Sequence, residues 1–285
     1  MANILVPKLT PDKTTVINGV TVHEHLLKNH NINNITLPPM RKKPLIAVTM
    51  HNTDDLPRVE DDGEQYTRAT INGNMHTVRT HYYVDDICAW QNLELERCNW
   101  TCADGTGQGN MQTIAIECIM SGKDGTDNIK ARDNAARLAA YILHKYGLTA
   151  NELRTHTYWL HIKDGKTGDV DKLCTTPHTY KTCPYYIIPD WQGFKALVNK
   201  YIVQLGGKAV TIPDKPTDDS FLVRVLDVAL NIRSAPGTQS KIVGVITDGG
   251  IYTIVETAMV GKVQWGKLKS GAGWISLGDK YVVKL

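Results

Sequence analysis

A change of pattern late in the chain constrains its fold more than any other feature of the sequence. Up to residue 205, apolar runs of strand length alternate with segments of helical periodicity, whereas from residue 220 only short strand-like runs with glycine turns remain. Between them, residues 206–219 lose periodicity and collect Gly, Pro and Asp, a composition typical of a linker. We therefore expect two domains, residues 1–205 and 220–285, joined by that linker.

The first domain is predicted to be α/β. The apolar run Leu45–Met50 and the β-branched run TIAIECIM at residues 113–120 are typical of strands buried on both faces. Residues 129–147 carry apolar side chains at helical spacing, with Gly147 where a C-terminal cap belongs. Alternation of such segments is typical of an α/β domain, for which we expect a mixed central sheet flanked by helices, the arrangement that the family resemblance described below implies. Further helices are expected at residues 22–31, 59–72 and 191–201, and a strand pair is expected around Asp85-Asp86.

The second domain is predicted to be a small all-β barrel, because its strand-like runs are short and separated by glycine turns. From Phe221 onward, eight Lys and Arg residues stand against four Asp and Glu, a basic balance that suits an anionic polymer. The domain lacks a Lys/Arg run or an aromatic ladder, so we expect no nucleic-acid binding. Strands are expected at residues 221–226, 229–236, 249–257, 263–270, 273–277 and 281–285.

Composition and the first residues bear on where the protein is made and acts. No run approaches the roughly 20 apolar residues of a membrane-spanning helix, so we expect no membrane insertion. The start, MANILVPKLTPDKTT, holds an apolar patch too short for a signal peptide, which predicts synthesis in the cytoplasm. The six cysteines include no CxxC pair and are expected to be free thiols, one of which can still bind a metal.

Four residues of the first domain are candidates for metal chemistry. His156 and Cys183 offer imidazole and thiolate, which are zinc ligands, but a catalytic zinc commonly takes three protein ligands and needs a proton acceptor nearby. His51 ends a buried strand, where it either faces a cleft or lies hydrogen-bonded in a turn. Glu117 interrupts an apolar strand, where it either lies on an exposed face, forms a salt bridge with Lys or Arg, or is a desolvated general base.

Two other features of the first domain are possible binding sites. His81 opens a predicted strand and is interpreted first as a pocket-lining or hydrogen-bonding residue and second as a metal ligand. The glycines within residues 105–109 do not make a dinucleotide-binding loop, because that fingerprint needs a helix directly after it and a strand follows instead.

The motifs of the first domain resemble those of the zinc-dependent N-acetylmuramoyl-L-alanine amidases of bacteriophages and their hosts, a branch of the peptidoglycan-recognition-protein superfamily. The resemblance covers residues 44–203 and rests on VTMHNTDD, HYYVDD, NWTCADGTGQGNMQTIAIE, DNAARLAAYILHKYGL, ELRTHTYW and KTCP, in that order. It implies the fold of that superfamily and a Zn²⁺ cofactor. It further implies that His51, His156 and Cys183 bind zinc, that Glu117 is the general base, and that Lys181 lies beside the reaction centre.

One departure from the family is a longer segment between the second histidine and the cysteine. The added residues, Leu160–Tyr180, contain His161 and His178, either of which could be the second ligand instead of His156. The RTH context and the Tyr158-Trp159 pair that follows favour His156. The insertion could instead rim the cleft and contact substrate.

The second domain resembles bacterial SH3-type cell-wall-binding modules, through ALNIRSAPGTQSKIVG and WGKLKSGAGWISL. Its Trp265, Trp274 and Tyr252 are candidates for ligand contact, with core packing as an equal alternative. His81 and Trp100 are the substrate-binding candidates of the first domain. The expected partners are peptidoglycan and Gram-positive cell-wall polymers.

The resemblance implies an endolysin that cleaves the amide between the lactyl group of N-acetylmuramic acid and L-alanine, and that reaches the wall through holin pores. A bacterial autolysin of the same chemistry is one alternative. A non-catalytic peptidoglycan-binding protein is another, although such proteins lack a zinc ligand. A cysteine peptidase using Cys183 or Cys102 is a third, which the proline after Cys183 disfavours.

Overall fold

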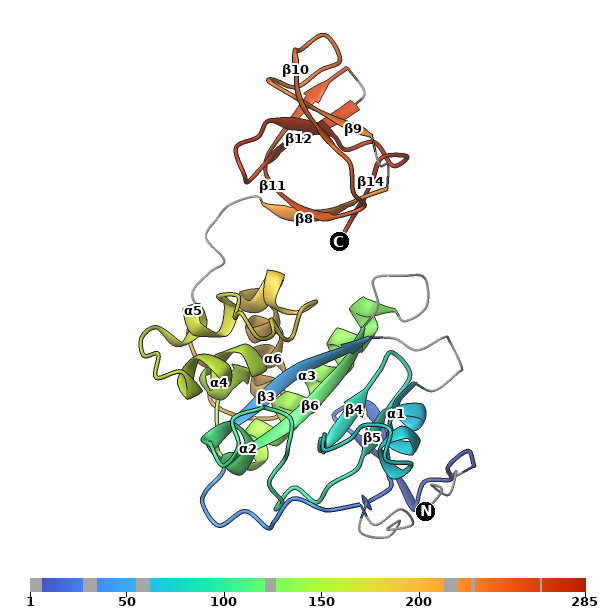
Figure 1. Ribbon diagram of the computed structural model, residues 1–285, viewed down its shortest axis with the longest axis vertical. Coiled ribbons are helices and arrows are strands. Elements are labelled where there is room, and N and C mark those ends of the chain that lie inside the picture. Colours follow the sequence, from blue (N-terminus) through green and yellow to red (C-terminus); the bar gives the residue numbers. More distant parts are fainter. Residues whose placement is uncertain are drawn as a thin grey trace. The chain divides into compact units, whose positions relative to one another are not determined.

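The chain forms two compact units, Met1–Ile212 and Pro213–Leu285 (Figure 1). The computed structural model describes residues 7–27, 35–54, 62–120, 127–212, 220–226, 229–261 and 263–285. Each unit has its own sheet and its own hydrophobic core. Of the predicted linker, residues 213–219 lie outside the described residues.

The first unit is built on a mixed sheet with the strand order β1-β2-β5-β4-β6-β3-β7. β4, β6, β3 and β7 run parallel to one another, and antiparallel pairs join β1 to β2 and β4 to β5. The predicted mixed central sheet is thereby confirmed. The strands are β1 (Lys13–Ile17), β2 (Val20–Glu24), β3 (Ala47–Asp54), β4 (Tyr82–Val84), β5 (Ala89–Gln91), β6 (Thr113–Met120) and β7 (Leu153–Thr155).

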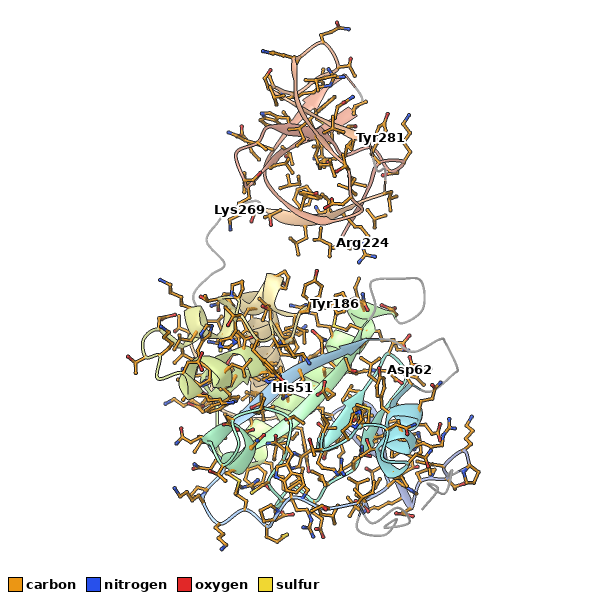
Figure 2. All side chains as sticks on the ribbon, viewed as in Figure 1. His51, Asp62, Tyr186, Arg224, Lys269 and Tyr281 are labelled. Carbon is orange, nitrogen blue, oxygen red and sulfur yellow. The ribbon has the colours of Figure 1, made fainter. Side chains whose placement is uncertain are left out.

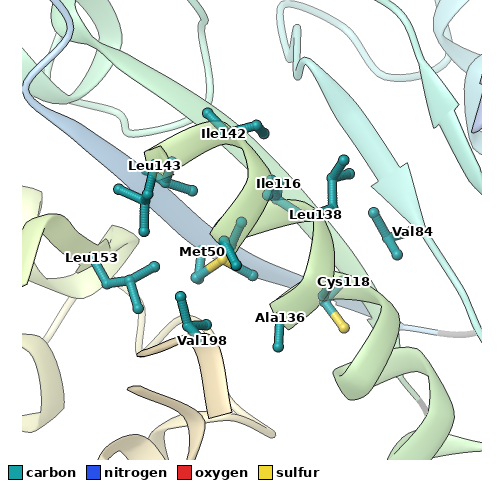
Figure 3. Close-up of a cluster of buried hydrophobic side chains, with 14 of the residues drawn as sticks. Met50, Val84, Ile116, Cys118, Ala136, Leu138, Ile142, Leu143, Leu153 and Val198 are labelled. Carbon is teal, nitrogen blue, oxygen red and sulfur yellow. The ribbon is translucent and has the colours of Figure 1, made fainter. Parts of the chain in front are cut away.

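One face of this sheet carries the main core. α3 (Asn128–Lys145) and α6 (Trp191–Gln204) pack on it, and Figure 3 shows Met50 of β3 and Ile116 of β6 gathered with Leu138 of α3 and Val198 of α6. These side chains are fully buried. Both helices lie where the apolar spacing of the sequence predicted them.

The opposite face of the sheet has smaller clusters and more polar groups. Side chains alternate between faces along a strand, so Ala47 and Ile119 point away from α3. There Trp159 covers Ala47, and Tyr66 packs against Ile119. The helices that bring these rings are α1 (Asp62–Ile71) and α4 (His156–Lys163); the short helices are α2 (Gln108–Gln112) and α5 (Val170–Thr175).

The helix expected at residues 22–31 is wrong. Residues 20–24 form β2, which pairs with β1 through a turn in which Asn18 and Gly19 both have positive φ, 49° and 83°. An Asn-Gly pair of this kind specifies a tight hairpin, and this local signal outweighs the weak helical spacing. Residues 28–31 lie outside the described residues.

The second unit is an all-antiparallel sheet with the order β10-β9-β13-β12-β11-β8-β14, which confirms the predicted all-β domain. Its core gathers one or two apolar side chains from each of most strands, among them Ile254 and Ile275. The strand β10 was not predicted. The strands are β8 (Phe221–Val225), β9 (Leu230–Arg233), β10 (Ile242–Ile246), β11 (Ile251–Val260), β12 (Val263–Leu268), β13 (Trp274–Ser276) and β14 (Val282–Lys284).

Candidate metal centre

His51 and Glu117 are neighbours because of strand register. β3 and β6 pair in parallel with His51 opposite Glu117, and both side chains point away from the face that Met50 and Ile116 share with α3. The Nδ1 atom of His51 lies 3.7 Å from the Oε1 atom of Glu117. Figure 2 labels His51 on β3, among the side chains of the first unit.

His156 reaches the same place from β7, on the other side of β3. Met50 of β3 pairs with Thr155, the last residue of β7, so His156 follows one step beyond that pair. The side chain of Thr155 caps α4 by accepting from the amide of Tyr158, which fixes His156 in the first turn of the helix. The rings of His51 and His156 are 5.0 Å apart between centroids.

Cys183 lies three residues after the insertion Leu160–Tyr180, and its backbone is hydrogen-bonded to Thr157. The amide of Cys183 donates to Oγ1 of Thr157 at 2.7 Å, and the amide of Thr157 donates to the carbonyl of Cys183 at 3.0 Å. The amide of Asn52, the residue after His51, donates to Sγ of Cys183 at 3.4 Å. This bond directs the sulfur toward His51, which lies within β3 and not at the end of the strand as the sequence predicted, because β3 continues to Asp54.

Together His51, His156 and Cys183 form a buried group that could hold a metal ion, with their ligand atoms all within 4.8 Å of one another. Neither ring nitrogen of His156 has a hydrogen-bond partner of acceptable geometry among the described residues. An unsatisfied buried imidazole is costly, and a metal ion would satisfy it. The two nitrogens and one sulfur are a donor set suited to zinc.

The histidines of this group are held neutral. Burial lowers the pKa of His51 well below its usual value, and the positive charge of Lys181 adds to the effect. Burial likewise lowers the pKa of His156 to about 3, again with Lys181 contributing. Because a metal binds the unprotonated nitrogen, both residues are ready to bind a cation at neutral pH.

The acidic groups of the centre are shifted in the opposite direction. Burial raises the pKa of Glu117 to about 7, and the charge of Lys181 opposes this rise. Burial and the nearby Glu117 raise the pKa of Cys183 to about 12. A cation at the centre would favour both ionised forms, so metal binding should release the thiol proton. Lys181 itself is exposed, and its charge acts on all four buried groups.

The raised pKa of Glu117 predicts a pH-dependent stability of the metal-free protein. Between the ordinary carboxyl pKa of about 4.5 and the folded-state pKa of about 7, the folded protein keeps a proton that the unfolded chain has lost. Stability therefore falls as pH rises through this window, by up to about 1.4 kcal/mol per pH unit. The measurement is the free energy of unfolding in urea for metal-free wild type and Glu117→Gln. The free energy of unfolding of Glu117→Gln should increase relative to that of the wild type as pH rises. A difference that does not change with pH would contradict the raised pKa of Glu117.

The two histidines of the insertion lie outside the metal group. Nε2 of His178 lies 2.9 Å from Oδ2 of Asp164, and its Nδ1 accepts from the amide of Tyr180. Nε2 of His161 lies 3.0 Å from the carbonyl of Thr176. The insertion forms the end of α4 and the short α5, and the structure brings His156 to the centre in place of either of these residues.

The predicted substrate contact at His81 is not supported by the structure. His81 is fully buried, with Nδ1 accepting from the amide of Ala115 and Nε2 at 3.1 Å from the carbonyl of Arg97. Both nitrogens are engaged by backbone, as the hydrogen-bonding interpretation expected. Trp100 is half-buried, and its backbone pairs with that of Arg79.

In the second unit, Trp265 and Trp274 are 4% and 8% exposed, so most of each ring is packed. Tyr252 packs against the core of the barrel. Trp265 also lines a cavity of about 560 Å³ together with Arg233, Lys280 and Tyr281. Trp274 is not among the residues lining this cavity.

Some residues that shape these sites were missed from the sequence. Thr157 and Asn52 hold Cys183 in place, and each stands beside a predicted ligand in the chain, which was the available signal. Arg233 and Lys280 stand beside the barrel cavity, and the only signal was the basic balance of the domain.

Residues 41–185, just over half of the chain, match the N-acetylmuramoyl-L-alanine amidase family, and residues 228–282 match the bacterial SH3 domain family. The chain therefore belongs to the N-acetylmuramoyl-L-alanine amidase family, as its motifs predicted, and carries a bacterial SH3 domain.

Two curated relatives come from Bacillus subtilis (strain 168). The N-acetylmuramoyl-L-alanine amidase XlyA is 28% identical over 172 residues, covering 59% of this chain and 50% of that protein. The N-acetylmuramoyl-L-alanine amidase CwlH is 27% identical over 148 residues, covering 52% and 50%. The chain thus spans about half the length of these relatives. The solved catalytic domain of XlyA is similar with a TM-score of 0.49 and 23% identity, covering 63% of this chain and 99% of that one.

Within the described part of the chain, none of the helices has the length and apolar character needed to span a membrane.

Proposed function

We propose that this protein is a zinc-dependent amidase that hydrolyses the bond between the lactyl group of N-acetylmuramic acid and L-alanine in peptidoglycan. The observation that carries the proposal is the buried group of His51, His156 and Cys183, next to Glu117, in a chain of the amidase family. The unsatisfied nitrogens of His156 support zinc as the occupant. We assign catalysis to residues 1–205, the linker to 206–219 and wall binding to 220–285.

Bound zinc, Glu117 and Lys181 would have different roles in the proposed hydrolysis. Bound zinc would polarise the scissile carbonyl and make the attacking water more acidic. Glu117 would accept the proton of that water and pass it to the leaving amine, a role suited to a carboxylate whose pKa burial raises to about 7. Lys181, exposed and close enough to influence all four buried groups, would stabilise the developing oxyanion.

The experiment that tests this function is digestion of purified Gram-positive cell walls followed by end-group analysis. An amidase releases new L-alanine amino termini without new reducing sugars. New reducing ends would instead indicate a glycosidase, and no new ends of either kind would favour a peptidoglycan-binding protein without catalysis.

A cysteine peptidase remains the competing enzyme class, because Sγ of Cys183 lies 4.0 Å from Nδ1 of His51. The raised pKa of the thiol and the lowered pKa of the imidazole both work against a thiolate nucleophile. Inhibition by a thiol alkylator but not by a zinc chelator would support the peptidase.

We further propose that the SH3 domain binds an anionic polymer of the Gram-positive wall at its cavity. Arg233 and Lys280 would supply positive charge, while Trp265 and Tyr281 supply aromatic surface. Lys280 is exposed, with its Nζ atom 4.6 Å from the ring centre of Tyr281. Binding to a polyanion through such groups should weaken as salt concentration rises.

Replacing Lys280 by glutamine is expected to weaken binding of the full chain to purified walls by about two- to fivefold, the effect of losing one exposed charge contact. The assay is wall sedimentation with protein that also carries Glu117→Gln, so that the wall is not digested. Lys241→Gln is the matched control, because Lys241 is an exposed lysine of the same unit that does not line the cavity. An equal loss of wall binding in Lys280→Gln and Lys241→Gln would contradict the proposal that the polymer binds at the cavity.

The combination of amidase and SH3 domains is consistent with an endolysin, and we propose that the protein is made in the cytoplasm of an infected cell and released through holin pores. A host autolysin has the same chemistry. Lysis of a Gram-positive host on expression with a holin, and not without it, would support the endolysin.

A further inference from the structure

The nitrogen of His51 that faces away from the metal group has a defined partner. Nδ1 points toward Cys183 and Glu117, whereas Nε2 lies 3.1 Å from Oγ1 of Thr101. Both side chains are buried, with His51 1% and Thr101 8% exposed. A hydroxyl can either donate to or accept from an imidazole, so the direction of this bond depends on where the hydroxyl proton goes.

Asn99 decides that direction. Its Nδ2 atom lies within 3.3 Å of the carbonyl oxygens of Gly109, Asn110 and Thr113, which accept hydrogen bonds but cannot donate them. The amide nitrogen therefore faces these carbonyls, and Oδ1 faces Thr101. Oδ1 accepts from the hydroxyl of Thr101 at 2.6 Å and from the amide of Thr101 at 3.2 Å. Asn99 is fully buried, so this orientation does not compete with solvent.

The proton on Thr101 is thus used by Asn99, and Oγ1 can only accept from His51. Nε2 of His51 must then carry the ring proton, and Nδ1 keeps its lone pair on the side of Cys183 and Glu117. The other tautomer would leave two lone pairs facing each other at 3.1 Å. Sγ of Cys102 lies 4.0 Å from Nε2, a longer contact than that of Thr101.

We propose that Thr101, oriented by Asn99, is a positioning residue that fixes His51 as the Nε2–H tautomer and directs its Nδ1 lone pair into the metal group. This inference rests on the proposed zinc site and adds to it residues that touch neither metal nor substrate. A second hydrogen bond on a metal-binding histidine sets its ring orientation, and losing such a partner typically costs about 10- to 100-fold in metal affinity.

The test compares zinc affinity, measured by competition with a chromophoric chelator, in full-length variants. Thr101→Val should bind zinc about 10- to 100-fold more weakly than wild type, while Thr101→Ser, which keeps the hydroxyl, should stay within about threefold. Thr70→Val is the matched control, because Thr70 is also buried but its hydroxyl donates to the carbonyl of Tyr66 and lies 3.2 Å from the hydroxyl of Tyr83, rather than contacting a residue of the metal group. Equal zinc affinity of Thr101→Val and wild type would overturn the proposal.

A second measurement needs no variant of Thr101 to fold. Long-range ¹H–¹⁵N NMR spectra of the metal-free wild type, with His51 assigned by comparison with His51→Gln, report the tautomer directly. The Nε2–H form is expected, and an Nδ1–H form would overturn the proposal. A wild type that takes up no zinc would refute the proposed function instead, and the tautomer would still decide the role of Thr101.

Discussion

Replacing Glu117 by glutamine is expected to lower the rate of wall hydrolysis by about 10²- to 10⁴-fold, the usual contribution of a general base. Glutamine keeps the shape of the side chain but cannot accept the proton of the attacking water. Since Glu117 is not one of the three grouped ligands, zinc should remain bound in a one-to-one ratio. The measurement is the release of L-alanine amino termini from purified walls, together with the zinc content of the purified protein.

Lys181→Met is an informative comparison, because it removes the exposed charge and leaves the carboxylate in place. It should lower the rate with zinc retained and should also raise the pKa of Glu117 further, since Lys181 opposes that rise. Full lytic activity of Glu117→Gln would exclude Glu117 as the base. Loss of zinc from Glu117→Gln would mean that the carboxylate supports the metal instead.

Replacing Cys183 by serine is expected to remove zinc as well as activity. A buried alcohol does not ionise as a thiol does, so the group would lose its soft anionic ligand and keep only two imidazoles. Losing the hydrogen-bond partner of a metal ligand already lowers metal affinity by about 10- to 100-fold. Losing the ligand itself should therefore lower zinc affinity by more than about 100-fold. The measurement is zinc content after dialysis, with affinity from chelator competition.

Cys98→Ser is the matched control for this substitution. Cys98 is also fully buried, and its Sγ donates to the carbonyl of Met111 at 3.5 Å, a bond that a serine hydroxyl can make. This variant should keep both zinc and activity. Retention of zinc in Cys183→Ser, with the protein folded by circular dichroism, would remove Cys183 from the proposed ligand set.

The parts of the fold that could be predicted are those whose evidence is local. The run TIAIECIM and the helical spacing after residue 128 are strong patterns, and β6 and α3 appear where those patterns lie. The region of β2 was mistaken because ten residues with weak helical spacing were given more weight than the Asn18-Gly19 turn before them. β10 was missed because its side chains are mostly exposed and do not alternate cleanly.

The candidate site shows the same limit. His51 is identified from its position after an apolar strand-like run, and Glu117 as a carboxylate within such a run, which are both local signals. That they face each other depends on the pairing of β3 with β6, which no local pattern specifies. Thr101 lies fifty residues from His51 in a loop of ordinary polar composition, so its contact with the imidazole could be found only from the fold.

The parallel strands β6, β3 and β7 should make Glu117, His51 and His156 less prone to local opening than Cys183. His51 and Glu117 lie within β3 and β6, and His156 directly follows β7; the amide hydrogens of these paired strands should exchange only on large-scale opening. Cys183 lies outside the sheet and is held mainly by hydrogen bonds with Thr157 and Asn52, so we expect its segment to open more readily than the strands. If the three residues hold a metal ion, Cys183 would be the first to release it, and His51 and His156 the last.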